Sequence, residues 1–468
     1  MSEGSAAKVN MAFIVAIVAV ATIGGFMFGY DSGVINGTQK GLESAFDLGS
    51  LGIGVNVGAI LVGSSIGAFG AGRMADIIGR RGVMMLSAIL FLASALLAGA
   101  AGSSAVFIIA RIVGGLGVGA ASVISPVYIS EVTPAAIRGR LSSVQQVMII
   151  SGLTGAFVAN FVLARYAGGS TAELWVDFPA WRWMFWIELV PATIFLVALL
   201  FIPESPRYLV SRSRGGDAHG VLERLFGTDF AQRKVSEIEA SLASDHRPRL
   251  SDLINKATGK IRPIVWTGIG LAVFQQLVGI NVVFYYGAVL WQAVGFSESD
   301  ALKINILSGA ISIGAVMLAI LLIDRIGRKP LLLIGSIGMA ITLTVMAVSF
   351  MSGELVDGKL SLSDDAGLAA LVAANLYVAF FNFSWGPVMW VMLGEMFPNQ
   401  IRGSGLAVSG FAQWMANFGI TMTFPIMLAT IGLTGAYGFY AASAAVSVIF
   451  VWAMVRETKG VELEDMQG

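Results

Sequence analysis

One carboxylate and one guanidinium in this sequence lie where charge is costly. Asp31 stands near the end of an apolar run that begins at Met11 and holds no other charged residue, within the stretch GGFMFGYDSGVING at residues 24–37. Arg111 lies within another apolar run. A charged side chain at the centre of a bilayer costs about 2.5 to 3.5 kcal/mol on insertion scales, so such groups are usually paired or functional. We therefore expect Asp31 to pair with Arg111.

Two roles fit such a pair. A purely structural ion pair would brace two helices against each other. Alternatively, the pair could switch its protonation, because burial favours the neutral carboxyl, the guanidinium favours the charged one, and a conformational change alters the balance. Asp31 and Arg111 are therefore candidate proton-coupling residues, with the structural brace as the alternative.

A second group of side chains has the chemistry needed to bind a polyol. Amide and hydroxyl groups satisfy sugar hydroxyls, while aromatic rings pack on the C–H face of a sugar ring. The candidates occupy three apolar runs of the second half and the start of one run of the first: Gln145, Gln146, Gln275, Gln276, Asn281, Tyr285, Asn382, Trp385, Trp390, Gln413, Trp414 and Asn417. The same residues could instead hold helices together or form interfacial belts.

The spacing of these residues predicts how their helices run. Gln413 and Asn417 are four residues apart and share one helix face. Gln276 and Tyr285 would lie on opposite faces of a straight helix. We therefore expect a break near Gly279, a device that transporters use at their binding sites.

A membrane-spanning frame must position these side chains. Of the 468 residues, 56% are hydrophobic and 12% charged, with a mean hydropathy of +0.80, which is too apolar for a soluble protein. The apolar runs are about 20 residues long, the length that crosses a bilayer. We predict twelve transmembrane helices, six before and six after a long polar segment. The first run has no small-residue cleavage site behind it, so we take it as a span rather than a removable signal.

Other chemistries are excluded by composition. The chain has no cysteine, which rules out disulfides and thiol catalysis, and its two histidines, His219 and His246, lie in the polar segment. We expect no metal site, no cofactor and no enzymatic activity, since no nucleophile–base pair is evident. No phosphate-binding loop is present, and the glycines at residues 114–119 indicate helix packing rather than nucleotide binding. The net charge of zero predicts no nucleic-acid partner.

The two halves of the chain repeat each other. EVTPAAIRG at residues 131–139 matches EMFPNQIRG at residues 395–403, and GRMADIIGRRG at residues 72–82 is echoed by LIDRIGRKP at residues 322–330. Such a duplication predicts two six-helix bundles that rock about a central site. We divide the chain into a first bundle (1–202), a cytoplasmic linker with short amphipathic helices (203–262), a second bundle (263–455) and a tail (456–468). The positive-inside rule places both termini in the cytoplasm.

The chain resembles the sugar porter family of the major facilitator superfamily, which includes bacterial sugar–proton symporters and animal glucose facilitators. The resemblance covers nearly the whole chain and rests on GRMADIIGRRG, RIVGGLGVG from Arg111, PESPR at residues 203–207, QQLVGIN at residues 275–281 and ETKG at residues 457–460. It implies an all-α membrane protein with the major facilitator fold. It also assigns sugar binding to Gln146, Gln275, Gln276, Asn281, Trp390, Gln413 and Trp414. Family members commonly carry an asparagine where this chain has Ser312, so one expected contact is missing.

Charged residues in the loops of both halves could form a cytoplasmic gate. Carboxylate–guanidinium pairs are strong hydrogen bonds, and we expect these pairs to form only when the two bundles close on that side. The resemblance implies a latch of the outward-facing state, built from Asp76, Arg80, Arg81, Glu131, Arg138, Asp324, Arg328, Glu395 and Arg402. The arginines could instead only set the topology. The arginine usual in the family after Asp76 is Ile77 here, which weakens one half of the latch.

The sequence predicts a symporter that couples a monosaccharide to a proton by alternating access. By resemblance, proton-coupled members carry an aspartate at the place of Asp31, whereas animal facilitators carry an asparagine. The apolar residues Leu153 and Phe284 near the matched site favour a hexose such as glucose. A proton-independent facilitator and a non-transporting sugar receptor are the alternatives. The expected partners are the sugar, the proton and the lipid of a bacterial inner membrane, with no nucleotide and no oligomer implied.

Overall fold

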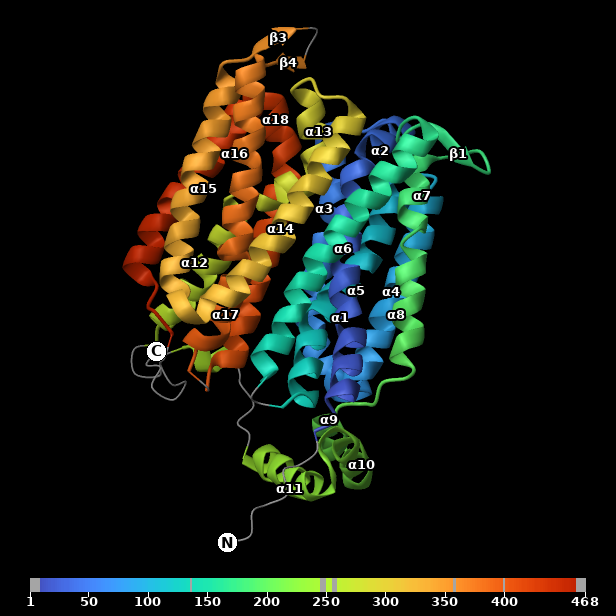
Figure 1. Cartoon of the computed structure of the whole chain (residues 1–468), viewed down its shortest axis with the longest axis vertical. Helices are drawn as coiled ribbons and strands as arrows, with labels where there is room; N and C mark the ends of the chain where they lie inside the picture. Colours follow the sequence, from blue (N-terminus) through green and yellow to red (C-terminus); the bar gives the residue numbers. More distant parts are fainter. Residues whose placement is uncertain are drawn as a thin grey trace.

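Two bundles of long helices lie side by side in the computed structural model of this chain (Figure 1). The structure describes residues 9–134, 137–244, 250–254, 259–356, 359–398 and 400–459. The first bundle contains α1 (Met11–Val34), η1 (Ile35–Gly37), α2 (Gln39–Phe46), α3 (Ser50–Ile78), α4 (Arg80–Ala100), α5 (Ser104–Val132), α6 (Arg138–Ala167), α7 (Ala180–Trp186) and α8 (Leu189–Leu199). The second contains α12 (Pro263–Leu277), α13 (Ile280–Ala293), α14 (Glu298–Ile326), α15 (Arg328–Met351), α16 (Asp364–Phe383), α17 (Trp385–Met396) and α18 (Arg402–Met454).

The predicted number of membrane crossings is confirmed. In the described part of the chain, 11 helical segments are long and apolar enough to span a bilayer. The last of them, α18, has 53 residues and merges two helices across Gly432, whose φ of 66° and ψ of −177° are not helical. Counting α18 as two spans gives the six-plus-six arrangement expected from the sequence.

The duplication is visible in equivalent turns of the two bundles. Gly79 joins α3 to α4 with a φ of +87°, and Gly327 joins α14 to α15 with a φ of +105°. Only glycine adopts these angles without strain. The repeated loop motif therefore encodes the same backbone turn in each half.

Close helix contacts explain the glycine-rich run of α5. A Cβ added to Gly115 would lie 2.1 Å from the main-chain oxygen of Ile60 on α3. No side chain fits in that space, so α3 and α5 approach closely because Gly115 lacks one. The packing role that the sequence predicts for this run is confirmed.

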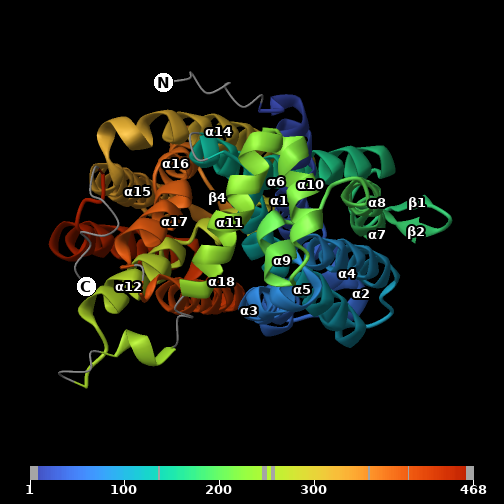
Figure 2. The same cartoon turned by 90° about the horizontal axis from the view of Figure 1, so that it is seen from below.

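The two ends of the molecule differ. Short helices of the linker, α9 (Pro206–Ser211), α10 (Gly215–Phe226) and α11 (Thr228–Ser244), lie across one end, which we call the linker end (Figure 2). Two hairpins lie at the opposite end, which we call the hairpin end (Figure 1). They are β1–β2 (Glu173–Trp175 with Phe178–Pro179) and β3–β4 (Glu354–Val356 with Lys359–Ser361). The first helix, α1, starts at the linker end, where Asn10 N–H donates to Leu225 O of α10.

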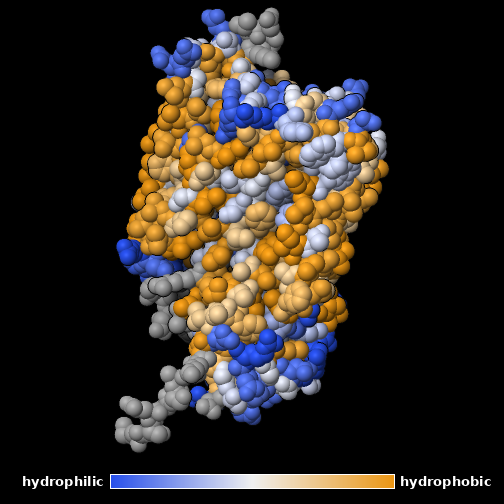
Figure 3. Space-filling model, turned by 45° about the vertical axis from the view of Figure 1, so that its right-hand side comes forward, coloured by the Kyte–Doolittle hydropathy of each residue, from blue (hydrophilic) through white to orange (hydrophobic). Residues whose placement is uncertain are grey.

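The surface has the polarity of a membrane protein. A broad apolar band crosses the middle of the face shown in Figure 3, and hydrophilic residues gather at both ends. Many large apolar side chains on this surface are exposed, among them Phe69, Leu321 and Ile449. Such a surface is compatible with hydrocarbon and not with water.

Candidate functional site

Asp31 and Arg111 form the ion pair that the sequence predicts. They lie on α1 and α5 near the hairpin end, and both side chains are fully buried. One guanidinium nitrogen of Arg111 donates to Asp31 Oδ1, and Nη2 donates to the main-chain oxygen of Asp31 at 2.8 Å. The second contact fixes the guanidinium independently of the carboxylate.

A second buried carboxylate, Glu188, lies beside this pair, and sequence reasoning missed it. Glu188 precedes α8, is fully buried and interacts electrostatically with both Asp31 and Arg111. Within the described part of the chain, neither carboxylate oxygen of Glu188 has a hydrogen-bond partner, and neither does Asp31 Oδ2. The available signal was an acidic residue inside the apolar run of residues 180–202. The site thus combines two carboxylates with one guanidinium.

Four of the predicted amide residues form one hydrogen-bond network. Gln276 Nε2 donates to Gln275 Oε1 at 3.1 Å, and Asn281 Nδ2 donates to Gln276 Oε1 at 2.6 Å. Gln413 of α18 also reaches Gln275 Oε1, at 3.4 Å, and Gln275 Nε2 donates to Trp385 O at 3.0 Å. The network joins α12, α13 and α18, as the clustering of these residues in the sequence predicts.

The predicted helix break lies at the centre of this network. α12 ends at Leu277 and α13 begins at Ile280. Between them, Gly279 has a φ of +82°, and a Cβ there would meet the Tyr440 ring at 2.7 Å. The break near Gly279 is therefore confirmed, and it brings residues of both half-helices to one place.

Aromatic residues connect the amide network to the first bundle. Trp414 is almost completely buried, and its ring lies 5.8 Å from the Phe28 ring of α1, measured between centroids. Tyr285 interacts with the side chains of Asn417 and Ser32. It also interacts electrostatically with Arg111 and Asp31. Tyr285 thus interacts with the predicted sugar-binding residue Asn417 and lies within electrostatic range of the ion pair.

The side chains of two predicted tryptophans take no part in the network. Trp385 is fully buried and its indole N–H donates to Ser336 Oγ at 2.9 Å, so the ring packs α17 against α15. This is the alternative helix-packing role. The Trp390 side chain is 40% exposed, and no hydrogen bond joins it to the amide residues among the described contacts.

The remaining polar candidates lie near Ser312 and on α6. Asn382 Nδ2 donates to Ser312 Oγ at 3.1 Å, so the serine that replaces the family's asparagine binds a neighbouring amide. Gln146 is half-buried. Its neighbour Gln145 is buried, and both of its amide atoms lack a hydrogen-bond partner in the described part of the chain.

The gate residues form pairs within each bundle, which corrects the expectation that such pairs need the bundles to close. Arg80 binds Glu131 through two bonds of 3.0 and 3.1 Å. Arg328 binds Glu395 in the same way at 2.9 and 2.7 Å. These pairs join helices of one bundle because each arginine begins a helix beside the end of the helix that carries its glutamate, α5 in the first half and α17 in the second.

The other gate residues also make local contacts. Asp76 and Asp324 are exposed and pair with the arginine four residues later, at 3.6 and 2.9 Å. Arg81 donates to Leu199 O at 2.8 Å, and Arg402 to Phe397 O at 3.2 Å. The side chain of Arg138 lies outside the described residues.

Two glutamates at the linker end complete these clusters, and the sequence reasoning gave them no role. Glu204 accepts the backbone N–H groups of Arg80 and Arg81, and its neighbour Ser205 donates to Glu131. Glu457 accepts the equivalent N–H groups in the second bundle. Each carboxylate sits at the start of a long helix, where negative charge is favourable. The motifs PESPR and ETKG therefore have the same structural role.

The environment of Glu457 favours its charged form. Burial alone would raise the pKa of the Glu457 carboxyl, but the backbone N–H groups of Lys459, Arg328, Lys329 and Thr458 donate to it and hold its pKa below its ordinary value. Thr458 Oγ1 in turn donates to Glu395 at 2.6 Å. Glu457 and Thr458 thus tie the segment after the last span to α15 and α17, respectively.

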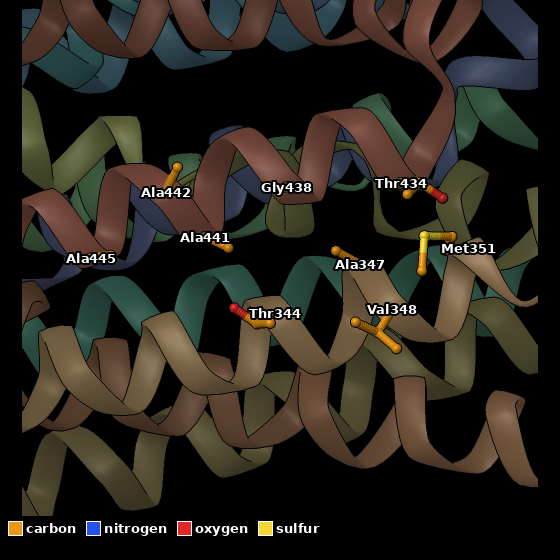
Figure 4. A pocket seen from close by; sticks show the side chains of 9 residues that line it. All are labelled: Thr344, Ala347, Val348, Met351, Thr434, Gly438, Ala441, Ala442 and Ala445. Carbon is orange, nitrogen blue, oxygen red and sulfur yellow. The ribbon is translucent and has the colours of Figure 1, made fainter.

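A groove on the outer face of the second bundle is unsuited to a polyol. It has a volume of about 390 Å³ and lies between α15 and the end of α18 (Figure 4). Its lining is mostly apolar, with Ala347, Val348, Met351 and Ala441 among its residues. None of the predicted sugar-binding residues lines it. Among the described residues no cluster of His, Cys, Asp or Glu suits a metal ion.

Comparison with known sequences gives consistent matches over the whole chain. A family profile described as "Sugar (and other) transporter" matches residues 17–468. The chain is 50% identical over 466 residues to a "Glucose transport protein" of Synechocystis sp., covering 99% of each chain. It is 37% identical over 492 residues to the "D-xylose-proton symporter" of Escherichia coli, covering 98% of this chain and 96% of that protein.

Solved structures show the same fold. The partially occluded inward-open conformation of the E. coli xylose transporter XylE matches with a TM-score of 0.83 at 35% identity, covering 96% of this chain and all of that one. XylE bound to 6-bromo-6-deoxy-D-glucose matches with a TM-score of 0.77 at 36% identity, covering 98% and 99% of the two chains. The two-bundle architecture is therefore that of a known class of membrane transporter.

Proposed function

We propose that this chain, which belongs to the sugar porter family of the major facilitator superfamily, couples the uptake of a monosaccharide to the entry of a proton. Its relatives are sugar transporters and not enzymes. The finer assignment is a hexose–proton symporter that works by alternating access.

The position of Tyr285, which interacts both with a predicted sugar-binding residue and with the ion pair, carries the proposal. Tyr285 interacts with Asn417 on one side and with Asp31 and Arg111 on the other. A sugar hydroxyl bound among the amides would therefore act on the same side chain that senses the charge of the pair. Coupling requires such a differential interaction between two sites.

Charge balance supports a proton site at Asp31. If both Asp31 and Glu188 were ionised, the buried cluster with Arg111 would carry a net negative charge in a site with no solvent exposure. Burying an uncompensated charge costs several kcal/mol. A proton shared by the two carboxyl groups removes that cost, and release of the proton requires the site to open.

Alternating access is supported by bonds between the bundles at the hairpin end. Asn36 of the first bundle donates to Phe284 O at 2.7 Å and accepts from the N–H of Ala288 and from Asn305 Nδ2, at 3.2 and 2.7 Å. At the linker end, the described gate pairs stay within each bundle. We infer that the structure is closed at the hairpin end, which the positive-inside rule places outside the cell.

A hexose fits the apolar part of the site. Leu153 and Phe284, which the sequence places near the matched site, are buried apolar side chains, and the 50% identical relative of Synechocystis is named for glucose. We propose glucose as the substrate, bound by the predicted residues Gln146, Gln275, Gln276, Asn281, Tyr285, Asn382, Trp390, Gln413, Trp414 and Asn417.

Uptake into proteoliposomes with an acidic exterior tests this function. We expect unlabelled glucose to inhibit labelled glucose uptake more strongly than xylose or arabinose, and the pH gradient to raise the accumulated amount. Glucose uptake that stops at equal concentrations inside and outside, with or without the pH gradient, would identify the second candidate, a facilitator. The hydrogen bond from Arg111 to the main-chain oxygen of Asp31 favours that alternative. This bond holds the guanidinium in place whether or not the carboxyl group changes its protonation.

A further inference from the structure

We propose that the β1–β2 hairpin is an anchor that inserts into the headgroup and glycerol region of the outer phospholipid leaflet. The hairpin connects α6 to α7. It stands out sideways at the hairpin end in Figure 1 and extends past the outline of both bundles in Figure 2. Both views place it beside the membrane-spanning helices, where lipid surrounds the protein, rather than above the transport path.

Five aromatic rings form a continuous chain through the hairpin and α7. The centroid of the Trp175 ring lies 6.1 Å from that of Tyr166 and 5.1 Å from that of Trp183. Trp186 lies 4.9 Å from Trp183 and 5.2 Å from Phe178. Three of these side chains are substantially exposed: Tyr166 by 74%, Trp175 by 46% and Phe178 by 41%. Aromatic rings with one polar edge accumulate at membrane–water interfaces.

The tip of the hairpin presents an apolar side chain at a backbone conformation that is costly for it. Val176 and Asp177 have φ values of +56° and +58°. A β-branched residue in the left-handed region is rare, and such strain often marks a functional position. Val176 is 78% exposed. A tip directed at water would gain nothing from valine, whereas a tip among glycerol and acyl groups buries it.

The hairpin is fixed to the bundle before it meets lipid. Arg182 of α7 donates to Gly99 O and Ala101 O at the end of α4, at 2.7 and 2.8 Å. Trp183 Nε1 donates to Trp175 O at 3.2 Å across the base of the hairpin. An anchor that is already rigid loses little conformational freedom when it inserts.

Hydrogen-bond chemistry favours a phospholipid as the partner. Within the described part of the chain, the indole N–H of Trp175 makes no hydrogen bond, while phosphate and ester oxygens are acceptors at the depth of the glycerol region. Glu173 and Asp177 are exposed beside the rings. Their carboxylates match the ammonium groups of phosphatidylethanolamine.

Site-directed spin labelling measures the depth of the tip directly. The chain has no cysteine, so Val176→Cys provides one labelling site. Ser361, an exposed residue of β4 at the same end, provides a matched control as Ser361→Cys. Both proteins are placed in vesicles of phosphatidylethanolamine and phosphatidylglycerol. Collisions with oxygen, which enters hydrocarbon, are compared with collisions with a water-soluble nickel chelate.

We expect the ratio of oxygen to nickel collisions to be severalfold higher at position 176 than at position 361. Adding Trp175→Glu and Phe178→Glu to Val176→Cys should lower the ratio to that of the control. Equal ratios at 176 and 361 would place the tip in water and overturn the proposal. A label at 176 shielded from both reagents would show a protein partner, and a ratio insensitive to the glutamates would exclude the rings; each result also overturns it.

Discussion

Replacing Asp31 by asparagine should separate transport from energy coupling. Asparagine keeps the size of the side chain and a carbonyl oxygen for Arg111, and the bond from Arg111 Nη2 to the main-chain oxygen of residue 31 does not depend on the side chain. Glu188 remains to compensate the guanidinium electrostatically. The variant should therefore fold and bind sugar, although it can no longer titrate at this position.

The expected loss is large and specific to accumulation. A membrane potential of 100 mV is worth about 2.3 kcal/mol for each charge that crosses, which corresponds to roughly 50-fold accumulation of a sugar that moves with one proton. Asp31→Asn should exchange sugar across the membrane at a rate near that of the wild type but accumulate none. The assay compares counterflow with uphill uptake in the same proteoliposomes.

A matched control and a clear opposite result make the experiment decisive. Asp300→Asn removes an exposed carboxylate at the hairpin end and should change neither activity. If Asp31 is instead the brace that holds Arg111, Glu188 and the main-chain bond do not suffice to compensate the guanidinium; its removal should then lower the free energy of unfolding by about 3 to 5 kcal/mol, and counterflow and uptake would fall together. Proton-dependent accumulation by Asp31→Asn would refute the coupling role outright.

Three further substitutions test the binding site and the clusters at the linker end. Gln276→Ala should raise the sugar Kd at least about tenfold, because removing one member of a buried hydrogen-bond network costs roughly 1 to 3 kcal/mol; calorimetric titration that finds an unchanged Kd in the folded variant would remove Gln276 from the site. Gly279→Ala should destabilise the protein by about 1 to 2 kcal/mol, since a side chain is strained in the left-handed region, and thermal unfolding with a wild-type midpoint would contradict the break. Glu457→Gln should lower the unfolding temperature at pH 7. Because the pKa of Glu457 is lowered, the stabilisation that its carboxylate provides is complete above the pKa of an unfolded glutamate, about 4.3. It is lost as the pH falls through the folded-state pKa, so the unfolding temperatures of the two proteins should become equal in acid. A difference in unfolding temperature that stays constant with pH would argue against this origin.

Features set by local chemistry could be predicted from the sequence. Asp31 and Arg111 are the charged residues of apolar runs, so the cost of burial predicts that they meet. The break at Gly279 follows from helical periodicity, because Gln276 and Tyr285 could not face one site on a straight helix. Both predictions depend on one or two residues and on geometry that every helix shares.

Contacts that depend on how distant segments of the chain pack together could not be predicted from the sequence. Glu188 joins the ion pair only because the start of α8 packs against α1, and no spacing in the sequence reports that contact. The pairing of Arg80 with Glu131 inside one bundle depends on which helix ends are neighbours in this conformation. The sequence does not distinguish Trp385 from Trp414, because both lie in apolar runs that also hold amide side chains. The Trp385 ring nevertheless packs against α15 and takes no part in the amide network.

The pH of a weakly buffered suspension of proteoliposomes tests the central claim most directly. With no gradient imposed, glucose added outside should enter together with protons, and the external pH should rise at a rate proportional to sugar entry. The rise should be abolished by an uncoupler and absent in Asp31→Asn, while counterflow persists in that variant. Glucose entry into wild-type vesicles at constant external pH would contradict proton coupling and identify the protein as a facilitator.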